Sequence, residues 1–252
     1  MSAKSQVILQ QLALVEGERN RRAAQPALDA KVVAVKAYQQ QRFSHTYADL
    51  SGTPRYGAVV KFFLDELYGP SDFTARDAQF ARVVPGLVKL FPEEVIQTVQ
   101  TLAELHALSE VLDSTMGARL ESPRIDARRY IQAWQATGQP VERSRQITLT
   151  LEVARRLNHF TRKPWLRTSL RLMRGPAKAA GLSVLQNFLE RGFDIFHSMG
   201  GADEFIEMVR IRETNLAAAL FNAGRVPNDS PDPYEAALKL LPDTGLNGVL
   251  QP

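Results

Sequence analysis

Residues 92–120, PEEVIQTVQTLAELHALSEVLDSTMGARL, form the longest uninterrupted helical pattern of the sequence. Pro92 suits the first position of a helix, where no amide hydrogen is needed, and the two glutamates after it favour the positive end of the helix dipole. At roughly 1.5 Å per residue such a helix would span a whole domain, so we expect other helices to pack around it. Apolar residues recur along it at intervals of three and four, as on one helical face: Val95, Val99, Leu102, Leu105, Leu112 and Met116.

The rest of the chain repeats this pattern, with prolines at helix starts and glycines at helix ends. The run ITLTLEV alternates like a strand, but we interpret it as helix because a single strand would have no partner. The sequence therefore predicts an all-α protein, a single compact bundle of about nine or ten helices. The predicted helices cover residues 4–19, 26–43, 54–68, 72–91, 92–120, 123–137, 141–160, 164–174, 183–199 and 203–224.

Three short sequence signals are expected to start, end or bend particular helices. Gly69-Pro70 is expected to close the third helix, and Pro85 to bend or split the fourth. Ser122-Pro123 is expected to act as a cap and first-turn pair for the helix after the central one. We assign residues 1–225 to the helical domain and residues 226–252 to a turn-rich tail with one short helix at 234–241.

Composition limits the classes of function. The 252 residues are 44% hydrophobic and 23% charged, an ordinary balance for a globular protein. The absence of cysteine excludes disulfides, thiolate metal sites and cysteine nucleophiles. No apolar stretch is long enough to cross a membrane, and the first residues do not resemble a signal peptide, so we expect a cytoplasmic protein. The net charge of +4 does not require a nucleic-acid partner, and no cue for sequence-specific DNA binding accompanies it.

Three runs of the sequence carry a family resemblance. They are residues 46–87, which include FFLDELYGP, residues 102–113, LAELHALSEVLD, and residues 185–205. Together they resemble a family of uncharacterised proteobacterial all-helical proteins, over most of the chain up to Phe221. The resemblance implies a bacterial, soluble, helical protein, and it carries over no functional residues.

Two of the predicted helices carry one histidine and two carboxylates at intervals of three and four residues, which brings them to one side of a helix. Imidazole and carboxylate ligands suit Fe, Mn or Zn, and two facing helices of a bundle can hold metal ions between them. The second set loosely resembles the ligand helix of haem-oxygenase-like di-metal oxidases, although the Glu-x-x-His spacing of di-iron proteins is absent. The candidate metal ligands are His106, Glu110, Asp113, Glu190, Asp194 and His197.

A more ordinary interpretation of these residues remains open. His106 can be a hydrogen-bonded flank histidine, and Glu110 and Asp113 can form a solvated face. His197 lies near a helix end, where a histidine complements the dipole. A haem is a further alternative for a helical bundle, with His106 or His159 as the axial ligand, but no signature selects either histidine.

The segment from Arg155 to Lys178 is strongly basic, because no Asp or Glu lies between Glu152 and Glu190. An arginine stripe could bind the phosphates of a nucleic acid or of a lipid surface. The alternative is a solvated face paired with the acids of a neighbouring helix. The residues that share one stripe, and are the candidates for binding an anionic surface, are Arg167, Arg171, Arg174 and Lys178.

The run FFLDELYGPSDFTARD, residues 62–77, predicts a helix–turn–helix corner with a charge network. Arg76 and Asp77 are neighbours in sequence and do not face each other on a helix, so each needs another partner. A binding role for this corner would require an exposed pocket there.

No phosphate loop, dinucleotide-binding glycine motif, zinc-protease motif or nucleophile elbow occurs in the sequence. The sequence thus favours a non-catalytic helical protein that binds a partner protein or a small apolar ligand. The alternative is a metal- or haem-dependent helical enzyme that uses the two histidine and carboxylate sets.

Overall fold

The computed structural model describes residues 2–66, 73–224 and 233–242 of the protein. All regular structure in these ranges is helical, which confirms the predicted all-α fold. The helices are α1 (Ala3–Ala23), α2 (Pro26–Thr46), α3 (Ala48–Ser51), α4 (Gly57–Glu66), α5 (Thr74–Leu90), α6 (Glu93–Arg119), α7 (Ala127–Thr137), α8 (Pro140–Thr161), α9 (Pro164–Leu172), α10 (Arg174–Ala179), α11 (Ser183–Ser198), α12 (Asp203–Asn222) and α13 (Pro233–Lys239).

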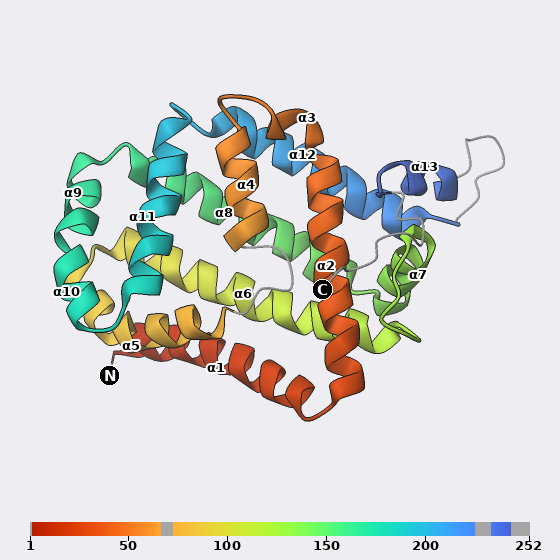
Figure 1. Cartoon of the computed structure of the whole chain (residues 1–252), viewed down its shortest axis with the longest axis horizontal. Coiled ribbons are helices and arrows are strands. Elements are labelled where there is room, and N and C mark those ends of the chain that lie inside the picture. Colours follow the sequence, from red (N-terminus) through yellow and green to blue (C-terminus); the bar gives the residue numbers. More distant parts are fainter. Residues whose placement is uncertain (1, 67–72, 225–232, 243–252) are drawn as a thin grey trace, which may run out of the picture.

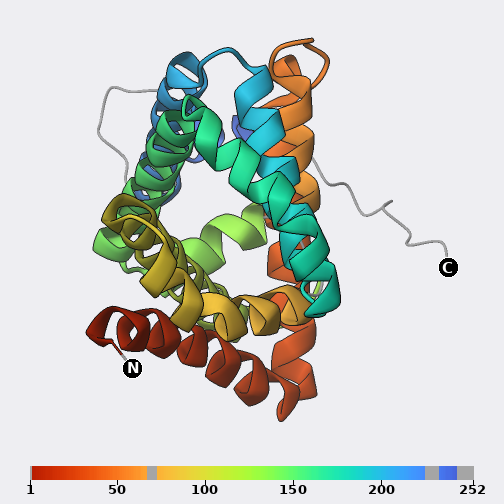
Figure 2. The same ribbon diagram turned by 90° about the vertical axis from the view of Figure 1, so that its left-hand side faces the viewer.

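The helix predicted from residues 92–120 is α6, and it lies at the centre of the packing. Helices α1, α2, α7 and α8 all contact it, and Figure 1 shows it running along the long axis of the molecule with α1 and α2 beside it. Figure 2 looks onto the end of the molecule formed by α5, α9, α10 and α11. Because α6 has neighbours on several sides, it buries residues all round and not only on its predicted apolar face.

Small side chains let α6 approach α1 and α2 closely. Ala103 packs against Ile8 and Leu12 of α1. A Cβ atom added to Gly117 would lie 2.6 Å from Cγ2 and 3.2 Å from the backbone N of Val32 on α2. Glycine at residue 117 is therefore required by helix packing rather than by backbone conformation.

We expect Gly117→Ala to lower the free energy of unfolding by about 2 kcal/mol, because α2 must move away from α6 to admit the methyl group. Urea unfolding monitored by circular dichroism measures this loss. The double variant with Val32→Ala should recover only part of it, since the backbone of residue 32 is also too close. Unchanged stability of Gly117→Ala would contradict the close packing of these two helices.

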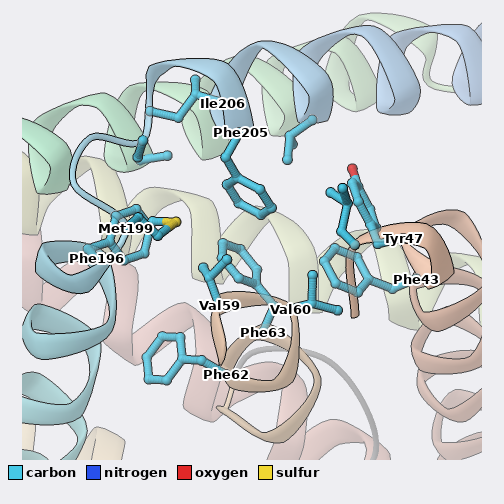
Figure 3. Close-up of a cluster of buried hydrophobic side chains, with 14 of the residues drawn as sticks. Phe43, Tyr47, Val59, Val60, Phe62, Phe63, Phe196, Met199, Phe205 and Ile206 are labelled. Carbon is cyan, nitrogen blue, oxygen red and sulfur yellow. The ribbon is translucent and has the colours of Figure 1, made fainter. Parts of the chain in front are cut away.

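The largest apolar cluster lies where α4, α11 and α12 meet the ends of α2 and α8. Figure 3 shows Phe63 of α4 and Phe205 of α12 pointing toward one another, with Phe43 and Tyr47 beside them. The ring of Phe43 lies 4.4 Å from that of Tyr47 and 5.7 Å from that of Phe63, measured between centroids. Aromatic packing thus fixes α4 on the helices around it.

A second cluster joins α2, α6, α7 and α12 to α13. Tyr38 and Tyr130 pack with ring centroids 4.5 Å apart, and Trp134 follows at 6.1 Å from Tyr130. Ala237 and Leu241 are buried in the same cluster. The helix that the sequence predicts within the tail is therefore packed against α7 and α12.

Three local signals in the sequence act differently from what we predict from them. Pro85 lies inside α5 without splitting it, since the missing amide removes only one helical hydrogen bond and Val84 beside it is fully buried. Gly175-Pro176 lies in the first turn of α10, which continues the chain in helical form after α9. Asp126, not Ser122, caps α7: its carboxylate accepts from the amide of Arg129 at 2.8 Å.

The expected closure at Gly69-Pro70 lies outside the described residues. Among the described helices, none combines the length and the apolar composition that crossing a bilayer requires.

Candidate functional site

The first predicted metal set lies on α6, where this helix faces α1 and α2. Glu110 is buried and accepts hydrogen bonds from Arg22 at 2.6 Å and from Lys36 at 2.8 Å. A third cation, Arg19, lies 3.4 Å from the same carboxylate. Glu110 is thus the common acceptor of a polar cluster that ties three helices together, and the interpretation of its carboxylate as part of a solvated face is wrong.

The surrounding cations determine the charge state of Glu110. Burial alone would raise the pKa of its carboxyl group, but the charge and hydrogen bond of Lys36 and the charges of Arg22 and Arg19 outweigh burial. The pKa is lowered from 4.5 to about 2. Glu110 is therefore ionised throughout the physiological pH range and contributes its charge to the packing of α1, α2 and α6.

The other two residues of the first set contact further side chains of the neighbouring helices. The imidazole Nε2 of His106 lies 2.9 Å from the carboxylate of Asp77 on α5. Asp113 is buried and accepts a hydrogen bond from Gln39 at 3.0 Å. Burial raises the pKa of the Asp113 carboxyl group, in contrast to Glu110. His106 and Glu110 therefore share Arg19, which lies 3.4 Å from each of them, while Asp113 binds Gln39 of α2.

The second predicted metal set lies on α11 and faces α9 and α10. Glu190 forms an ion pair with Arg174, and Asp194 pairs with Arg167 at 2.8 Å. The Nδ1–H of His197 donates to the carbonyl oxygen of Thr161 at 3.0 Å. Two candidate metal ligands are thus the counterions of two arginines that the sequence assigns to anion binding.

The two sets do not come together. In the part of the chain that the structure describes, no three His, Asp or Glu side chains are grouped so that they could hold a metal ion. His159, one candidate for haem ligation, has an exposed side chain near Glu94, while His106, the other, is engaged with Asp77. The geometry therefore provides no assembled set of three such ligands for Fe or Mn within residues 2–66, 73–224 and 233–242.

A further buried arginine has no signal in the sequence. Arg143 on α8 is 3% exposed, and its guanidinium lies 4.1 Å above the ring of Trp134. It donates to Gln146 at 3.1 Å and approaches the sulfur of Met116 at 3.8 Å. Because Arg143 occupies an ordinary polar position of an amphipathic helix, no feature of the sequence distinguishes it from an exposed arginine.

The structure places a pocket at the corner predicted from residues 62–77. Its volume is about 390 Å³, within the range of small-molecule sites. The end of α4, the start of α5 and the first turns of α11 surround it, and residues 67–72, which connect α4 to α5, lie outside the described residues. The pocket is lined by Glu66, Phe73, Ala75, Arg76, Val184, Asn187, Phe188 and Arg191.

Arg76 is the central side chain of this corner. Its guanidinium carbon lies 4.2 Å from the ring centroid of Phe73 and 4.6 Å from that of Phe188, so both rings contact it. It also donates to the backbone carbonyl of Glu66 at 2.8 Å and lies 3.6 Å from the carboxylate of Asp77. The expectation that Arg76 and Asp77 do not pair is wrong, because the side chain of Arg76 turns back toward its neighbour.

A second arginine closes the other side of the pocket. Arg191 of α11 forms ion pairs with Glu66 at 2.7 Å and with Asp65 at 3.0 Å. Its positive charge is therefore compensated within the wall. The pocket thus combines apolar and aromatic surface with polar groups held at fixed positions, which is the usual make-up of a ligand site.

Comparison with known proteins adds one finding. The profile of a family described as a domain of unknown function (DUF8198) matches residues 18–227. The chain belongs to this family. The DUF8198 match covers most of the chain, including both walls of the pocket and all of α6. No curated protein and no solved structure matches the chain.

Proposed function

We propose that this DUF8198 protein is a non-catalytic binding protein whose corner pocket takes a small, largely apolar ligand. The observation that carries this proposal is the cavity of about 390 Å³ between α4, α5 and α11. It lies at the corner for which a binding role requires an exposed pocket. A site of this size can enclose a small organic molecule.

The walls indicate the chemistry of such a ligand. Phe188 and Val184 offer apolar surface, and Val184 is 48% exposed without a ligand. Asn187 lines the pocket and makes no side-chain hydrogen bond to the described residues, so its amide can both donate and accept. These features suit a ligand with an aromatic or aliphatic body and one hydrogen-bonding group.

The ionic groups of the pocket restrict its charge preference. Arg191 is compensated by two carboxylates, and Arg76 lies beside Asp77. A strongly charged ligand would have to compete with these pairs, whereas a neutral or singly charged amphiphile would not. This argument favours ligands with no more than one charge.

A large side chain that fills the pocket should strongly weaken the binding of a small amphiphilic ligand. Ala75 is exposed and lines the cavity, and we expect Ala75→Phe to weaken binding of the fluorescent amphiphile 1-anilinonaphthalene-8-sulfonate at least tenfold, since the ring would occupy the ligand volume. Fluorescence titration of the folded protein measures the affinity. Ala78→Phe is the matched control, because Ala78 is also exposed on α5 but does not line the pocket.

Equal affinity of the wild type, Ala75→Phe and Ala78→Phe would contradict the proposal. So would a wild-type protein that binds no amphiphilic probe while keeping its helical circular dichroism. Native mass spectrometry of the purified protein provides a direct second readout, since a molecule retained in the pocket should be present in Ala78→Phe and absent from Ala75→Phe.

A further inference from the structure

A second surface, separate from the pocket, lies at the end of the molecule formed by α5, α9, α10 and α11 (Figure 2). Large hydrophobic side chains are exposed in these helices, and Leu172 is the most exposed of them on α9, at 73%. Exposed apolar side chains that gather at one end of a protein mark an interaction surface. The exposed apolar residues of this surface are Leu90, Trp165, Leu172, Met173 and Leu189, whereas Val184 at the start of α11 lines the pocket.

Helix α9 presents two of these side chains on one outward face. Trp165 and Leu172 are seven residues apart, which is two helical turns, and Trp165 is 45% exposed. Thr168 and Ser169 lie between them, and their hydroxyls donate to the carbonyls of Pro164 and Trp165 in the same helix. The hydroxyl groups of this face are therefore already hydrogen bonded. Burying the face against a partner would leave no hydroxyl donor without an acceptor.

The charge of this end is positive. Arg167 and Arg174 are paired with Asp194 and Glu190 of α11. Arg171 and Lys178 are exposed and form no ion pair with the described residues. Arg171 lines the crevice between α9 and α11, where Glu190 also pairs with Arg174, and Lys178 lies on α10. Cations thus outnumber acids at this end, close in sequence to the exposed Leu172 and Met173.

The shape of the surface distinguishes between two kinds of partner. A protein partner usually inserts side chains into a recess, but the crevice between α9 and α11 has a volume of only about 10 Å³. Leu166 and Leu170 of α9 pack inward, whereas Trp165 and Leu172 are exposed at a positively charged end of the molecule, as in helices that lie in the headgroup region of a bilayer. Tryptophan favours this region, and Lys and Arg are attracted by anionic lipids.

We propose that the end of the molecule with Trp165 and Leu172 on the outward face of α9, and with Arg171 and Lys178 as nearby exposed cations, binds reversibly to anionic lipid bilayers. Trp165 and Leu172 enter the headgroup region, and Arg171 and Lys178 approach the lipid phosphates and carboxylates. The protein is then a peripheral membrane protein at this end, and the pocket between α4, α5 and α11 remains in the aqueous phase beside the bilayer.

Co-sedimentation of the full-length protein with sucrose-loaded vesicles tests this proposal. We expect binding to phosphatidylcholine vesicles that contain phosphatidylserine, weaker binding to pure phosphatidylcholine, and a decrease with rising salt. Arg171→Gln/Lys178→Gln should lower the partition coefficient roughly 30-fold. Leu172→Ser should lower it about tenfold.

Matched controls separate a defined face from general charge attraction. Arg119→Gln/Arg124→Gln removes two exposed arginines near the junction of α6 and α7, and Val141→Ser replaces a side chain that is 74% exposed on α8. Both should bind vesicles like the wild type. A blue shift of tryptophan emission on binding should vanish in Trp165→Phe, because the other tryptophan, Trp134, is already buried.

Three results would overturn the proposal. The first is no sedimentation with anionic vesicles at low ionic strength. The second is equal loss in the control pair and in Arg171→Gln/Lys178→Gln. The third is binding to soluble polyglutamate, dependent on Arg171 and Lys178, without vesicle binding and without a tryptophan shift, which would assign the face to an acidic protein.

Discussion

Glu110→Gln is expected to lower the free energy of unfolding by about 3 kcal/mol at pH 7. The variant leaves Arg22 and Lys36 facing a neutral amide in a buried cluster. The size of the loss follows from the lowering of the carboxyl pKa from 4.5 to about 2, since each pKa unit corresponds to about 1.4 kcal/mol. Chemical unfolding in urea at pH 7 measures it.

The same substitution predicts a particular pH dependence. A carboxyl group whose pKa is lower in the folded state stabilises the protein above its unfolded pKa of 4.5 and loses this contribution as the pH falls toward 2. The stability difference between wild type and Glu110→Gln should therefore be constant above about pH 5.5 and shrink below pH 4.5. A difference that persists unchanged at pH 3 would show that the loss has another cause.

Asp113→Asn, one helical turn away, is the control for this result. Burial raises the pKa of Asp113, so its ionised form is disfavoured in the folded protein and contributes no stability at pH 7. Asparagine keeps the oxygen that accepts from Gln39. We expect a change of less than about 1 kcal/mol, and a loss as large as that of Glu110→Gln would contradict the assignment of Glu110 as the central acceptor.

Phe205→Ala is expected to cost about 4 kcal/mol, because it removes a fully buried ring from the largest apolar cluster. The ring contacts those of Tyr47, Tyr56 and Phe63, with centroids 5.9 to 6.4 Å away. These neighbours come from two segments, the end of α2 and α4 with the residue before it, so the movement of one helix would not close the cavity. Differential scanning calorimetry should show a large decrease in melting temperature.

Leu90→Ala provides the comparison, since Leu90 is 80% exposed at the end of α5. It should change stability by less than about 0.5 kcal/mol. If Phe205→Ala and Leu90→Ala were equally mild, the cluster of Figure 3 would not be the main source of stability for α4 and α12.

The helices of this protein follow from its sequence because their signals are local. The spacing of apolar residues and the start at Pro92 predict α6 to within one residue at each end. Pro85 is the instructive exception. Its effect depends on the burial of Val84 against α1, and contacts between distant segments are invisible to a local pattern.

The polar cluster around Glu110 could not be predicted for a similar reason. Its partners come from α1 and α2, some 74 to 91 residues earlier in the chain. Spacing on α6 shows that His106, Glu110 and Asp113 share a side of the helix, but not what that side faces. The same three residues are compatible with a metal site, a solvated face or an ion cluster, and only the packing of α1 distinguishes these outcomes.

The basic segment shows the same limitation on a smaller scale. Its acid-free composition predicts a positive surface, but Arg167 and Arg174 form ion pairs with acids of α11. The sequence analysis assigns the two arginines to an anion-binding surface and their carboxylate partners, Asp194 and Glu190, to a metal site. The corner pocket is a different case, because the sequence states only that a binding role would require a pocket there, and Phe188 and Arg191 of its wall are contributed by α11.

The DUF8198 match and the physical unit of folding have different limits. The match begins at residue 18, inside α1, and ends at residue 227, before α13. A chain trimmed to the matched residues would lose Ile8 and Leu12, and the apolar side chains of Val84 and Ala103 would become exposed to solvent. At the other end it would uncover Leu216 and Leu220, which Ala237 and Leu241 now shield. Recombinant versions intended for crystals or binding assays should therefore keep both flanking helices.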